Sequence, residues 1–466
     1  MYRCLALFSL LNATVAAFET PNVILVMCDD MGYGDPECFW ANTRARTPQI
    51  DAMAEAGLRF TRFYAAAPVC SPTRGSCLTG RHPYRYGVYS ANTGHLPREE
   101  VTIPEFLKRS GYMTGHFGKW HLGTLTTTVR DSNRGGPKSK SHFSPPRFHG
   151  FDDSFVTEAK VPTFDPLLKP SNATRFGWDA LSDSQVAESF GTRYWDHSGR
   201  EVKENLRGDD SRIIMDCAEQ FIQDAAAREQ PFFAGIWFHA PHLPVVASRE
   251  DREPWKKLSP LERNYFGCIA ALDRQVGRLR QLLRHLEIER DTVIFFCSDN
   301  GPEGNSRAPG SAGNFRGRKR SLYEGGVRVP GIVEWPGGIA AGRSTNVAAV
   351  TSDYLPTILD LIGAPLPQSR PLDGVSLKPV LLGQPFQRKK PIGFQSGRQL
   401  AWHDGALKLI SNNEGDVWEL YDLDADPSES NDLASGRPED VRRLSSALRR
   451  WQQSCQQSDM GNDYRK

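Results

Sequence analysis

The residues best suited to chemistry lie in the run from Cys70 to Arg81, which reads Cys-Ser-Pro-Thr-Arg-Gly-Ser-Cys-Leu-Thr-Gly-Arg. Proline favours the start of a helix and serine the position before it, so a helix is predicted to begin at Pro72 and to end near Gly80. Cys70 then lies beside the helix N-terminus, which favours anions and lowers the pKa of a thiol. Cys70 is a candidate nucleophile on these grounds, and a half-buried structural cysteine would explain this stretch equally well.

Oxygen-bearing side chains follow two strand-like apolar runs that lie far apart in the sequence. Asp29 and Asp30 follow the first run, and Asp299 and Asn300 follow the second. Either pair alone would more often form a turn or a helix cap. Four hard oxygen donors without a zinc-type cysteine or histidine pattern suit Ca²⁺ or Mg²⁺, so both pairs are expected in one crevice.

Basic and imidazole side chains form a third group of candidates. Lys119 and His121 follow a short apolar run, His239 follows another, and Lys319 precedes a Gly-rich loop. A lone lysine or histidine is by default structural. An anionic substrate held by a cation, however, needs more positive charge and a proton donor for its leaving oxygen, and catalytic groups gather in such loops.

The elements that must position these residues alternate between strand and helix. Unbroken apolar runs, typical of strands buried on both faces, cover residues 23–28, 232–238 and 292–297. Helical spacing or helix boundary signals cover residues 47–56, 103–110, 210–228 and 261–286. This alternation predicts an α/β fold with a large mixed, mostly parallel sheet sandwiched by helices.

The rest of the chain follows other patterns. Residues 124–207 are expected to form long loops over the sheet edge, around a short helix at most. Beyond them, residues 399–410 and 417–423 resemble antiparallel strands, and 438–457 a charged helix. We therefore expect a smaller C-terminal α+β domain. The predicted division is a signal peptide at 1–17, a catalytic α/β domain at 18–377 and an α+β subdomain at 378–466.

Composition and charge narrow the class of protein. The 466 residues include 57 Lys and Arg against 55 Asp and Glu, so bulk charge gives no argument for a nucleic-acid partner. A basic start, an apolar stretch and Val15-Ala16-Ala17 predict a cleaved export signal, and no segment is long enough for a membrane span. Nine cysteines, with one in that signal and one spent on chemistry, leave room for one or two disulfides.

Taken together, these motifs resemble the type I sulfatases of the alkaline phosphatase superfamily. Cys70 to Arg74 fits the family's C-x-P-x-R motif, and the likeness extends to five further segments in the expected order. Those segments are Pro21 to Asp35, Gly118 to Gly123, His239 to His242, Ser298 to Gly301 and Tyr323 to Gly326.

The resemblance implies that a separate formylglycine-generating enzyme oxidises Cys70 to formylglycine, whose hydrate Arg74 steadies. One hydroxyl of the hydrate attacks sulfur and expels the alcohol; the other then ejects sulfate and restores the aldehyde. The resemblance also implies bound Ca²⁺, with Mg²⁺ as the alternative. Its ligands would be Asp29, Asp30, Asp299, Asn300 and the modified Cys70.

The remaining implied roles concern the substrate. Lys119 and Lys319 would bind the sulfate oxygens. His239 would contact the substrate and donate a proton to the departing alcohol, with help from Lys319, and His121 would be the base that breaks down the sulfated intermediate. His242 is a further candidate for substrate contact.

Three functions stay open at this point: a sulfatase acting on sulfated sugars or another small sulfated molecule, a phosphonate or phosphate diester hydrolase of the same superfamily, and a glycan-binding protein that has lost catalysis. Oligomeric state is not readable from the sequence. Five basic residues could contact a polyanionic glycan, although a solvated loop is the simpler interpretation. They are Arg130, Arg134, Lys138, Lys140 and Arg147.

Overall fold

The computed structural model describes residues 20–182, 184–305, 307–368 and 370–464. Its centre is an eleven-stranded sheet in the order β12-β2-β11-β10-β1-β9-β3-β4-β7-β8, with β13 also paired to β2. The strands are β1 (Asn22–Cys28), β2 (Leu58–Tyr64), β3 (Met113–Lys119), β4 (Asp153–Thr157), β7 (Tyr194–Asp196), β8 (Glu201–Val202), β9 (Phe232–Trp237), β10 (Thr292–Ser298), β11 (Arg328–Glu334), β12 (Arg343–Thr345) and β13 (Ala349–Val350).

The central strands β10, β1, β9, β3 and β4 pair in parallel, whereas β11 and β7 pair antiparallel with their neighbours. Side chains of β1, β9 and β10 are buried along almost their whole length, because helices cover both faces of the sheet. The predicted mixed, mostly parallel sheet is confirmed.

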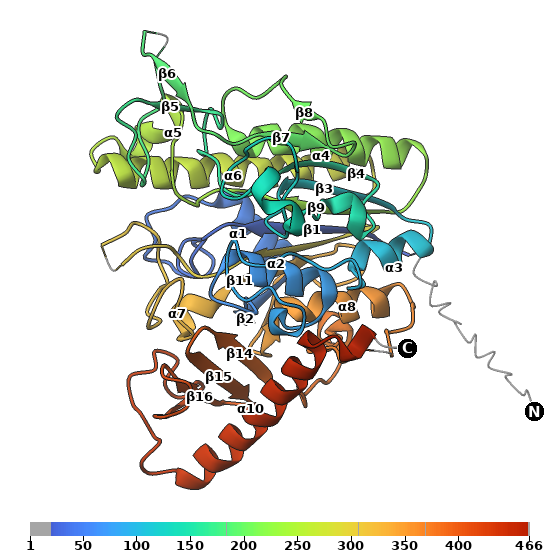
Figure 1. Ribbon diagram of the computed structural model, residues 1–466, viewed down its shortest axis with the longest axis vertical. Helices are drawn as coiled ribbons and strands as arrows, with labels where there is room; N and C mark the ends of the chain where they lie inside the picture. The colour runs from blue at the N-terminus through green and yellow to red at the C-terminus, as the bar shows by residue number, and fades with distance from the viewer. Residues whose placement is uncertain (1–19, 183, 306, 369, 465–466) are drawn as a thin grey trace, which may run out of the picture.

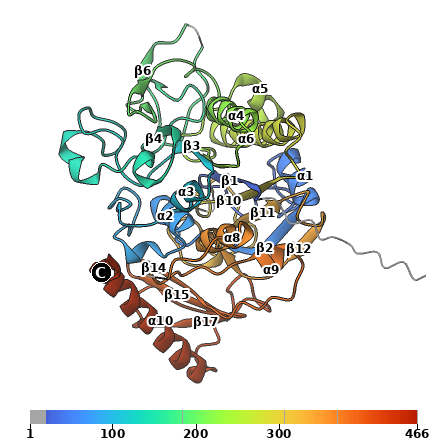
Figure 2. The ribbon, with the colours of Figure 1, turned by 90° about the vertical axis from the view of Figure 1, so that its right-hand side faces the viewer.

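Two helical layers enclose the sheet, as Figures 1 and 2 show. One layer holds α1 (Pro48–Ala56), α4 (Asp210–Ala227) and α6 (Pro260–His285), and the other holds α2 (Cys70–Thr79), α3 (Ile103–Arg109) and α8 (Tyr354–Leu361). Within the first layer, Ile214 of α4 and Leu272 of α6 pack in one core; on the other face, Leu78 of α2 and Leu355 of α8 share a second core. Each predicted helix is present within a few residues of its expected bounds.

The segment 124–207 contributes more to the sheet than the sequence indicated. It supplies β4, parallel to β3, and the pair β7 and β8 at the sheet edge. A small hairpin of β5 (Leu168–Pro170) and β6 (Ala187–Ser189) projects from the same region (Figure 1). The helical turns described in this segment are the 3₁₀ turns Pro137–His142 and Pro146–His149, within the allowance of a short helix at most. The strands of this segment are too short and too polar to show a clear alternation of apolar and polar residues in the sequence.

The C-terminal region forms a four-stranded antiparallel sheet with one long helix, as the predicted α+β class requires. The strands are β14 (Ile392–Ser396), β15 (Gln399–Asp404), β16 (Leu407–Ser411) and β17 (Glu419–Asp422), and the helix is α10 (Pro438–Asp459). Leu444 and Leu448 of α10 pack on Leu400 and Leu409 of this sheet. The run expected as one strand is two strands joined by a turn at Gly405, whose φ of 65° suits glycine.

The short helix α9 (Lys378–Leu381) begins where the second domain was expected, yet Val380 and Leu381 pack in the core shared with α8. The boundary at residue 378 stays a prediction. The predicted signal peptide lies outside the described residues. Across the described chain, no helix combines the length and apolarity that crossing a bilayer requires.

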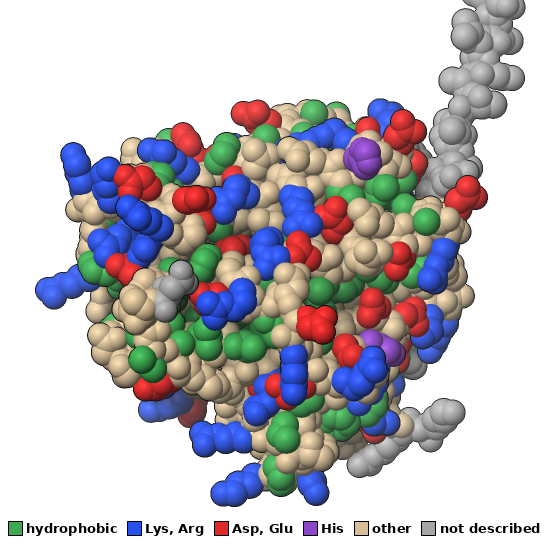
Figure 3. All heavy atoms as spheres, turned by 90° about the horizontal axis from the view of Figure 1, so that it is seen from above, with side chains coloured by type: hydrophobic (Ala, Val, Ile, Leu, Met, Phe, Trp, Pro, Cys, Tyr) green, Lys and Arg blue, Asp and Glu red, His purple; other side chains and the backbone are tan. Residues whose placement is uncertain are grey.

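All eight described cysteines are unpaired, and Cys4 lies outside the described residues. On the face seen in Figure 3, acidic and basic side chains are both spread over the surface, in keeping with the nearly balanced charge.

Candidate active site

The two pairs of oxygen donors meet at the carboxyl ends of neighbouring strands. Cys28 of β1 is in register with Ser298 of β10, so Asp29 and Asp30 emerge beside Asp299 and Asn300. The backbone N–H of Asp30 donates to Oδ1 of Asp299 at 3.1 Å, and Nδ2 of Asn300 donates to Oδ1 of Asp30 at 2.7 Å. All four residues are buried. The structure thus brings both pairs into one crevice.

Cys70 joins this cluster as the first residue of α2, with Sγ 3.5 Å from Oδ1 of Asp29. The helix therefore begins two residues before the predicted start, and Ser71 is inside it rather than capping it. Pro72 permits this, because N–H groups of the first turn have no partner within the helix.

The predicted lowering of the pKa of the thiol is wrong. Burial and the neighbouring Asp299 raise the pKa of Cys70 to about 12, although the positive charges of Lys119 and Lys319 act to lower it. Burial among carboxylates thus outweighs the helix terminus, and the unmodified thiol is a poor nucleophile at neutral pH.

Arg74 lies one turn along α2 and is completely buried. Its Nε and Nη2 donate to Oδ2 of Asp299 at 3.1 and 2.6 Å, and the guanidinium lies 5.2 Å from the ring centre of Trp237. Arg74 therefore orients Asp299 and brings positive charge to within 3.7 Å of Asp29.

Two lysine ammonium groups complete the charged cluster. Nζ of Lys119, at the end of β3, donates to Oδ2 of Asp29 at 2.6 Å. Nζ of Lys319 donates to Oδ1 and Oδ2 of Asp30 at 2.5 and 2.8 Å. Burial acts to lower the pKa of each lysine, but the facing Asp carboxylates raise it above its usual value, so both carry a positive charge.

The Lys319 loop is anchored by the motif that follows it. Glu324, in the short helix α7 (Glu324–Val327), accepts from Lys408 of the C-terminal sheet at 2.8 Å and from Arg328 at 3.2 Å. Lys408 also lies 2.9 Å from Glu429. A buried ionic network thus fastens this loop to the second sheet.

The three candidate histidines lie in different environments. His239 is completely buried, with Nδ1 2.8 Å from Oδ2 of Asp210 and Nε2 2.6 Å from Oγ1 of Thr157. It does not line the cavity above Cys70. Both ring nitrogens are occupied by protein groups, so the structure does not favour the predicted substrate contact and proton donation by His239.

His242 faces the site instead. Its Nδ1 lies 2.6 Å from the carbonyl oxygen of Leu243, and its Nε2 lies 3.7 Å from Oδ2 of Asp30. Since a carbonyl can only accept, Nδ1 carries the proton and Nε2 presents its lone pair. Burial and the charges of Lys319 and Lys119 hold the pKa of His242 well below its usual value, so the ring is neutral.

His121 also lines the cavity, in a left-handed backbone conformation with φ of 56°. Its Nε2 lies 2.8 Å from Oδ1 of Asn92, whereas its buried Nδ1 has no hydrogen-bond partner among the described residues. Burial, followed by the positive charge of Lys119, holds the pKa of His121 well below its usual value. Asn92 was not predicted as a site residue, because the Ala-Asn-Thr-Gly turn that contains it carries no functional pattern.

The donor set fits a hard divalent cation. Ligand atoms of Asp29, Asp30, Cys70 and His242 lie within 4.8 Å of one another. Buried Oδ1 of Asn300 has no hydrogen-bond partner among the described residues, as a ligand oxygen reserved for a cation would. Oxygen-rich sites of this kind suit Ca²⁺ or Mg²⁺.

The charges around Asp30 also favour a bound cation. Burial raises the pKa of Asp30, and the carboxylates of Asp29 and Asp299 raise it further, against Lys319. Three carboxylates therefore lie close together, and the positive charge near Asp30 does not fully offset their mutual repulsion. A divalent cation bound there would supply the missing positive charge.

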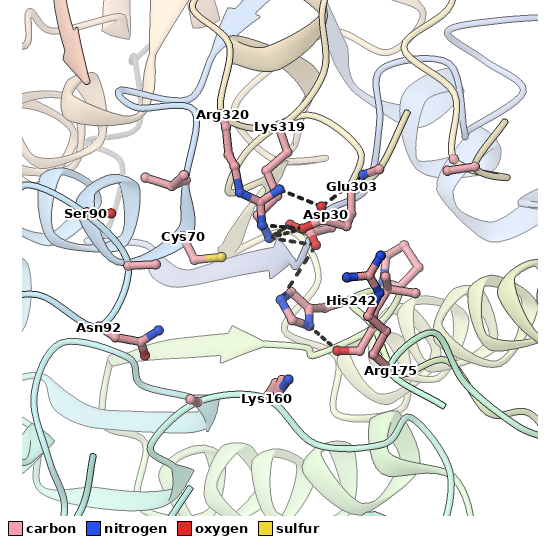
Figure 4. A pocket seen from close by; sticks show the side chains of 18 of the residues that line it. Asp30, Cys70, Ser90, Asn92, Lys160, Arg175, His242, Glu303, Lys319 and Arg320 are labelled. Atoms are coloured by element: carbon pink, nitrogen blue, oxygen red, sulfur yellow. Dashed lines mark hydrogen bonds and ion pairs between the residues drawn. The ribbon is translucent and has the colours of Figure 1, made fainter. Parts of the chain in front are cut away.

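A cavity of about 1150 Å³ opens above this cluster. Figure 4 shows Asp30, Cys70, His242 and Lys319 converging at its floor. Typical small-molecule sites measure roughly 300–1,000 Å³, so this one has room for more than a single small ester.

Comparison with known proteins agrees with this geometry. A family model described as Sulfatase matches residues 21–364, and one described as the C-terminal part of N-sulphoglucosamine sulphohydrolase matches residues 310–454. The chain is 33% identical over 402 residues to N-acetylgalactosamine-6-sulfatase of Canis lupus familiaris, covering 82% of this chain and 70% of that protein. It is 35% identical over 387 residues to human arylsulfatase A, covering 80% and 70%.

A solved structure shows the same arrangement over nearly the whole chain. The crystal structure of Ps i-CgsB in complex with k-i-k-neocarrahexaose superposes with a TM-score of 0.79 at 26% identity, covering 96% of this chain and 97% of that one. The buried carboxylates, the cysteine at the start of α2 and these matches lead to one conclusion: the chain belongs to the sulfatase family of the alkaline phosphatase superfamily and is a sulfuric ester hydrolase.

Proposed function

We propose that this protein removes sulfate from sulfated sugars or glycans through a formylglycine made from Cys70, beside a Ca²⁺ ion. The observation that carries the proposal is the position of Cys70, 3.5 Å from Asp29 in a large cavity that Lys119 and Lys319 also line. The dog relative is named for a sulfated amino sugar, and the Ps i-CgsB structure holds an oligosaccharide, which supports a sugar substrate.

Asp29, Asp30, Asp299 and Asn300 would hold the cation, with Mg²⁺ as the alternative, and residue 70 would be a further ligand. When bound, the cation supplies positive charge that polarises the sulfate ester and favours the ionised nucleophile. The formylglycine hydrate supplies an attacking hydroxyl and an internal route for sulfate release. Arg74 keeps Asp299 oriented and places charge near that hydrate.

Lys119 and Lys319 would bind the sulfate oxygens, since both are charged and point into the anionic cluster. Lys319 also carries a proton at rest, whereas Nε2 of His242 does not. We therefore assign the proton of the leaving alcohol to Lys319, in place of His239, and keep His242 for the substrate contact already expected of it. His121 would accept the proton that drives sulfate release, through Nδ1.

Maturation and location follow from the same proposal. A formylglycine-generating enzyme would be the maturation partner, and the predicted signal at residues 1–17 would export the chain. The lysine-lined, calcium-type site is compatible with that setting, where calcium is plentiful.

The proposal is tested by producing the wild type and Cys70→Ala together with a formylglycine-generating enzyme. Sulfate release from 4-nitrophenyl sulfate and from sulfated sugars is then measured, with an aryl phosphonate diester in parallel. We expect release by the wild type alone. Equal release by both proteins would end the proposal, and a higher kcat/KM on the phosphonate would identify a diester hydrolase instead.

A further inference from the structure

The wall of the cavity built by the segment 124–207 carries positive groups that the proposed chemistry does not use. Lys160 and Arg175 both line the cavity. Among the described residues, neither charged group has a hydrogen-bonded or ion-paired partner; the guanidinium of Arg175 lies 4.6 Å from the ring centre of Phe176. Figure 4 shows them on the His242 side of the cavity, with Lys319 and Arg320 on the other.

Lys160 is held in place without a counter-ion. It follows the carboxyl end of β4, and its carbonyl oxygen accepts from Oγ1 of Thr192 at 3.1 Å. The acidic group that acts on its ammonium is Glu303, which is already bound by Arg320 at 2.5 and 2.9 Å. Burial, and then the charges of Lys119 and Lys319, lower the pKa of Lys160. An anionic ligand would offset both effects.

Arg175 lies in a turn fastened to the wall that contains His242. Oγ1 of Thr174 donates to the carbonyl of Gly177 at 2.8 Å, and the N–H of Val245 donates to the carbonyl of Phe176 at 3.0 Å. Gly177 has φ of 143°, and a Cβ there would lie 2.0 Å from the carbonyl oxygen of Val245. This close approach fixes the turn, and with it the base of the Arg175 side chain, beside the cavity.

We propose that Lys160 and Arg175 form a second anion site, which binds a negatively charged group of the substrate other than the sulfate being hydrolysed. The inference rests on the proposed function and deepens it. The reacting sulfate already has Lys119 and Lys319, so two further unpaired cations on another part of the wall exceed what one sulfate requires. A cavity of about 1150 Å³ has room for the sugar between the two anions.

This site defines a substrate class: a sugar unit with the reacting sulfate ester and a second anionic substituent, either another sulfate or a uronate carboxylate. Aromatic rings suited to a sugar face line the same cavity at Tyr84 and Tyr89. None of the five basic residues considered from the sequence lines it. Arg134, for example, pairs with Glu158 at 2.9 Å.

The test uses the mature enzyme, Lys160→Ala, Arg175→Ala and the double variant. Lys138→Ala serves as a matched control, since Lys138 is exposed, lies in the same segment and is not among the residues that line the cavity. Each protein hydrolyses 4-nitrophenyl sulfate in the presence of one of three inhibitors: inorganic sulfate, a hexosamine with two sulfates, or a monosulfated disaccharide with a uronic acid.

We expect the double variant to bind at least one two-anion sugar about tenfold or more weakly, because charge-assisted hydrogen bonds are lost. Its kcat/KM for 4-nitrophenyl sulfate and its inhibition by inorganic sulfate should match those of Lys138→Ala. The sugar that loses affinity identifies the second group as sulfate or carboxylate.

Equal weakening for inorganic sulfate would place both cations on the reacting sulfate and overturn the proposal. Unchanged inhibition by both two-anion sugars would also overturn it. An enzyme inactive on every sulfate ester would instead refute the proposed function. Calorimetric titration of the two sugars into Cys70→Ala, with and without the double substitution, would then still decide the second anion site.

Discussion

Oδ1 of Asn92 lies 2.8 Å from Nε2 of His121 and 2.9 Å from Nδ2 of Asn133, so one carboxamide oxygen joins both groups. Because this oxygen can only accept, Nε2 of His121 must carry the ring proton. Nδ1 is then left with a lone pair and no partner among the described residues, as a proton acceptor requires.

Replacing Asn92 by alanine should therefore release the tautomer of His121. We expect kcat on 4-nitrophenyl sulfate to fall about tenfold or more while KM stays close to that of the wild type, since the wrong tautomer impairs a catalytic histidine more than substrate binding. Asn133→Ala is the control, because it removes a second donor to the same oxygen but leaves the His121 contact. A normal kcat in Asn92→Ala would show that Asn92 does not fix the tautomer of His121 for catalysis.

The pH dependence of kcat follows from the lowered pKa of His121. Because its pKa is lowered, His121 stays unprotonated as the pH falls through about 6.5, the ordinary pKa of histidine. It becomes protonated, and can no longer act as a base, only below its own pKa. The acid limb of kcat due to His121 should thus lie below about 6.5. A limb at or above that pH that disappears in His121→Gln would contradict this assignment.

The different settings of His239 and His242 predict opposite phenotypes. His239→Phe leaves buried oxygens of Asp210 and Thr157 without a donor or acceptor, so the free energy of unfolding should fall by about 1–3 kcal/mol while kcat of the folded enzyme changes little. His242→Phe should retain its Tm and lose about tenfold in kcat/KM, since the side chain can then no longer accept a hydrogen bond at Nε2 from a substrate hydroxyl. Denaturant unfolding and steady-state kinetics on both variants check this. The reverse pattern would return the substrate contact to His239.

Chelation should reveal the cation through stability as well as activity. Removal of Ca²⁺ should lower Tm, and calcium at about 100 times its Kd should restore roughly 2.7 kcal/mol. Asn300→Ala should show a much smaller calcium-dependent shift in Tm, since it removes the unpartnered oxygen. Asn305→Ala, at the exposed cavity rim, is the control. A Tm that does not respond to Ca²⁺ or Mg²⁺ would argue against a cation at these four residues.

Much of this site could be predicted because strand ends are visible in the sequence. The apolar runs before Asp29 and Asp299 are buried on both faces, and the carboxyl ends of parallel neighbours must open into the same crevice. The helix beside Cys70 was visible through Pro72 and Gly80. Its first residue was not, because a proline is tolerated anywhere in the first turn.

The remaining features depend on contacts between distant segments. His239 and His242 are three residues apart in one short motif, and it is Asp210 of α4 and Thr157 of β4 that hold His239 away from the cavity. The direction of the pKa shift of Cys70 depends on burial beside Asp299, which no local pattern contains. The short strands within 124–207 show no clear alternation of apolar and polar residues, so the sequence did not predict them. For the same reason it did not predict that Lys160 and Arg175 line the cavity.

The most direct measurement compares catalysis with the chemical state of residue 70. Mass spectrometry of the peptide containing Cys70 gives the fraction present as aldehyde, and kcat on a sulfate ester is measured on the same preparations, made with and without a formylglycine-generating enzyme. We predict that kcat rises in proportion to the aldehyde fraction and extrapolates to zero for unmodified cysteine. Full activity from protein whose residue 70 is entirely cysteine would contradict it.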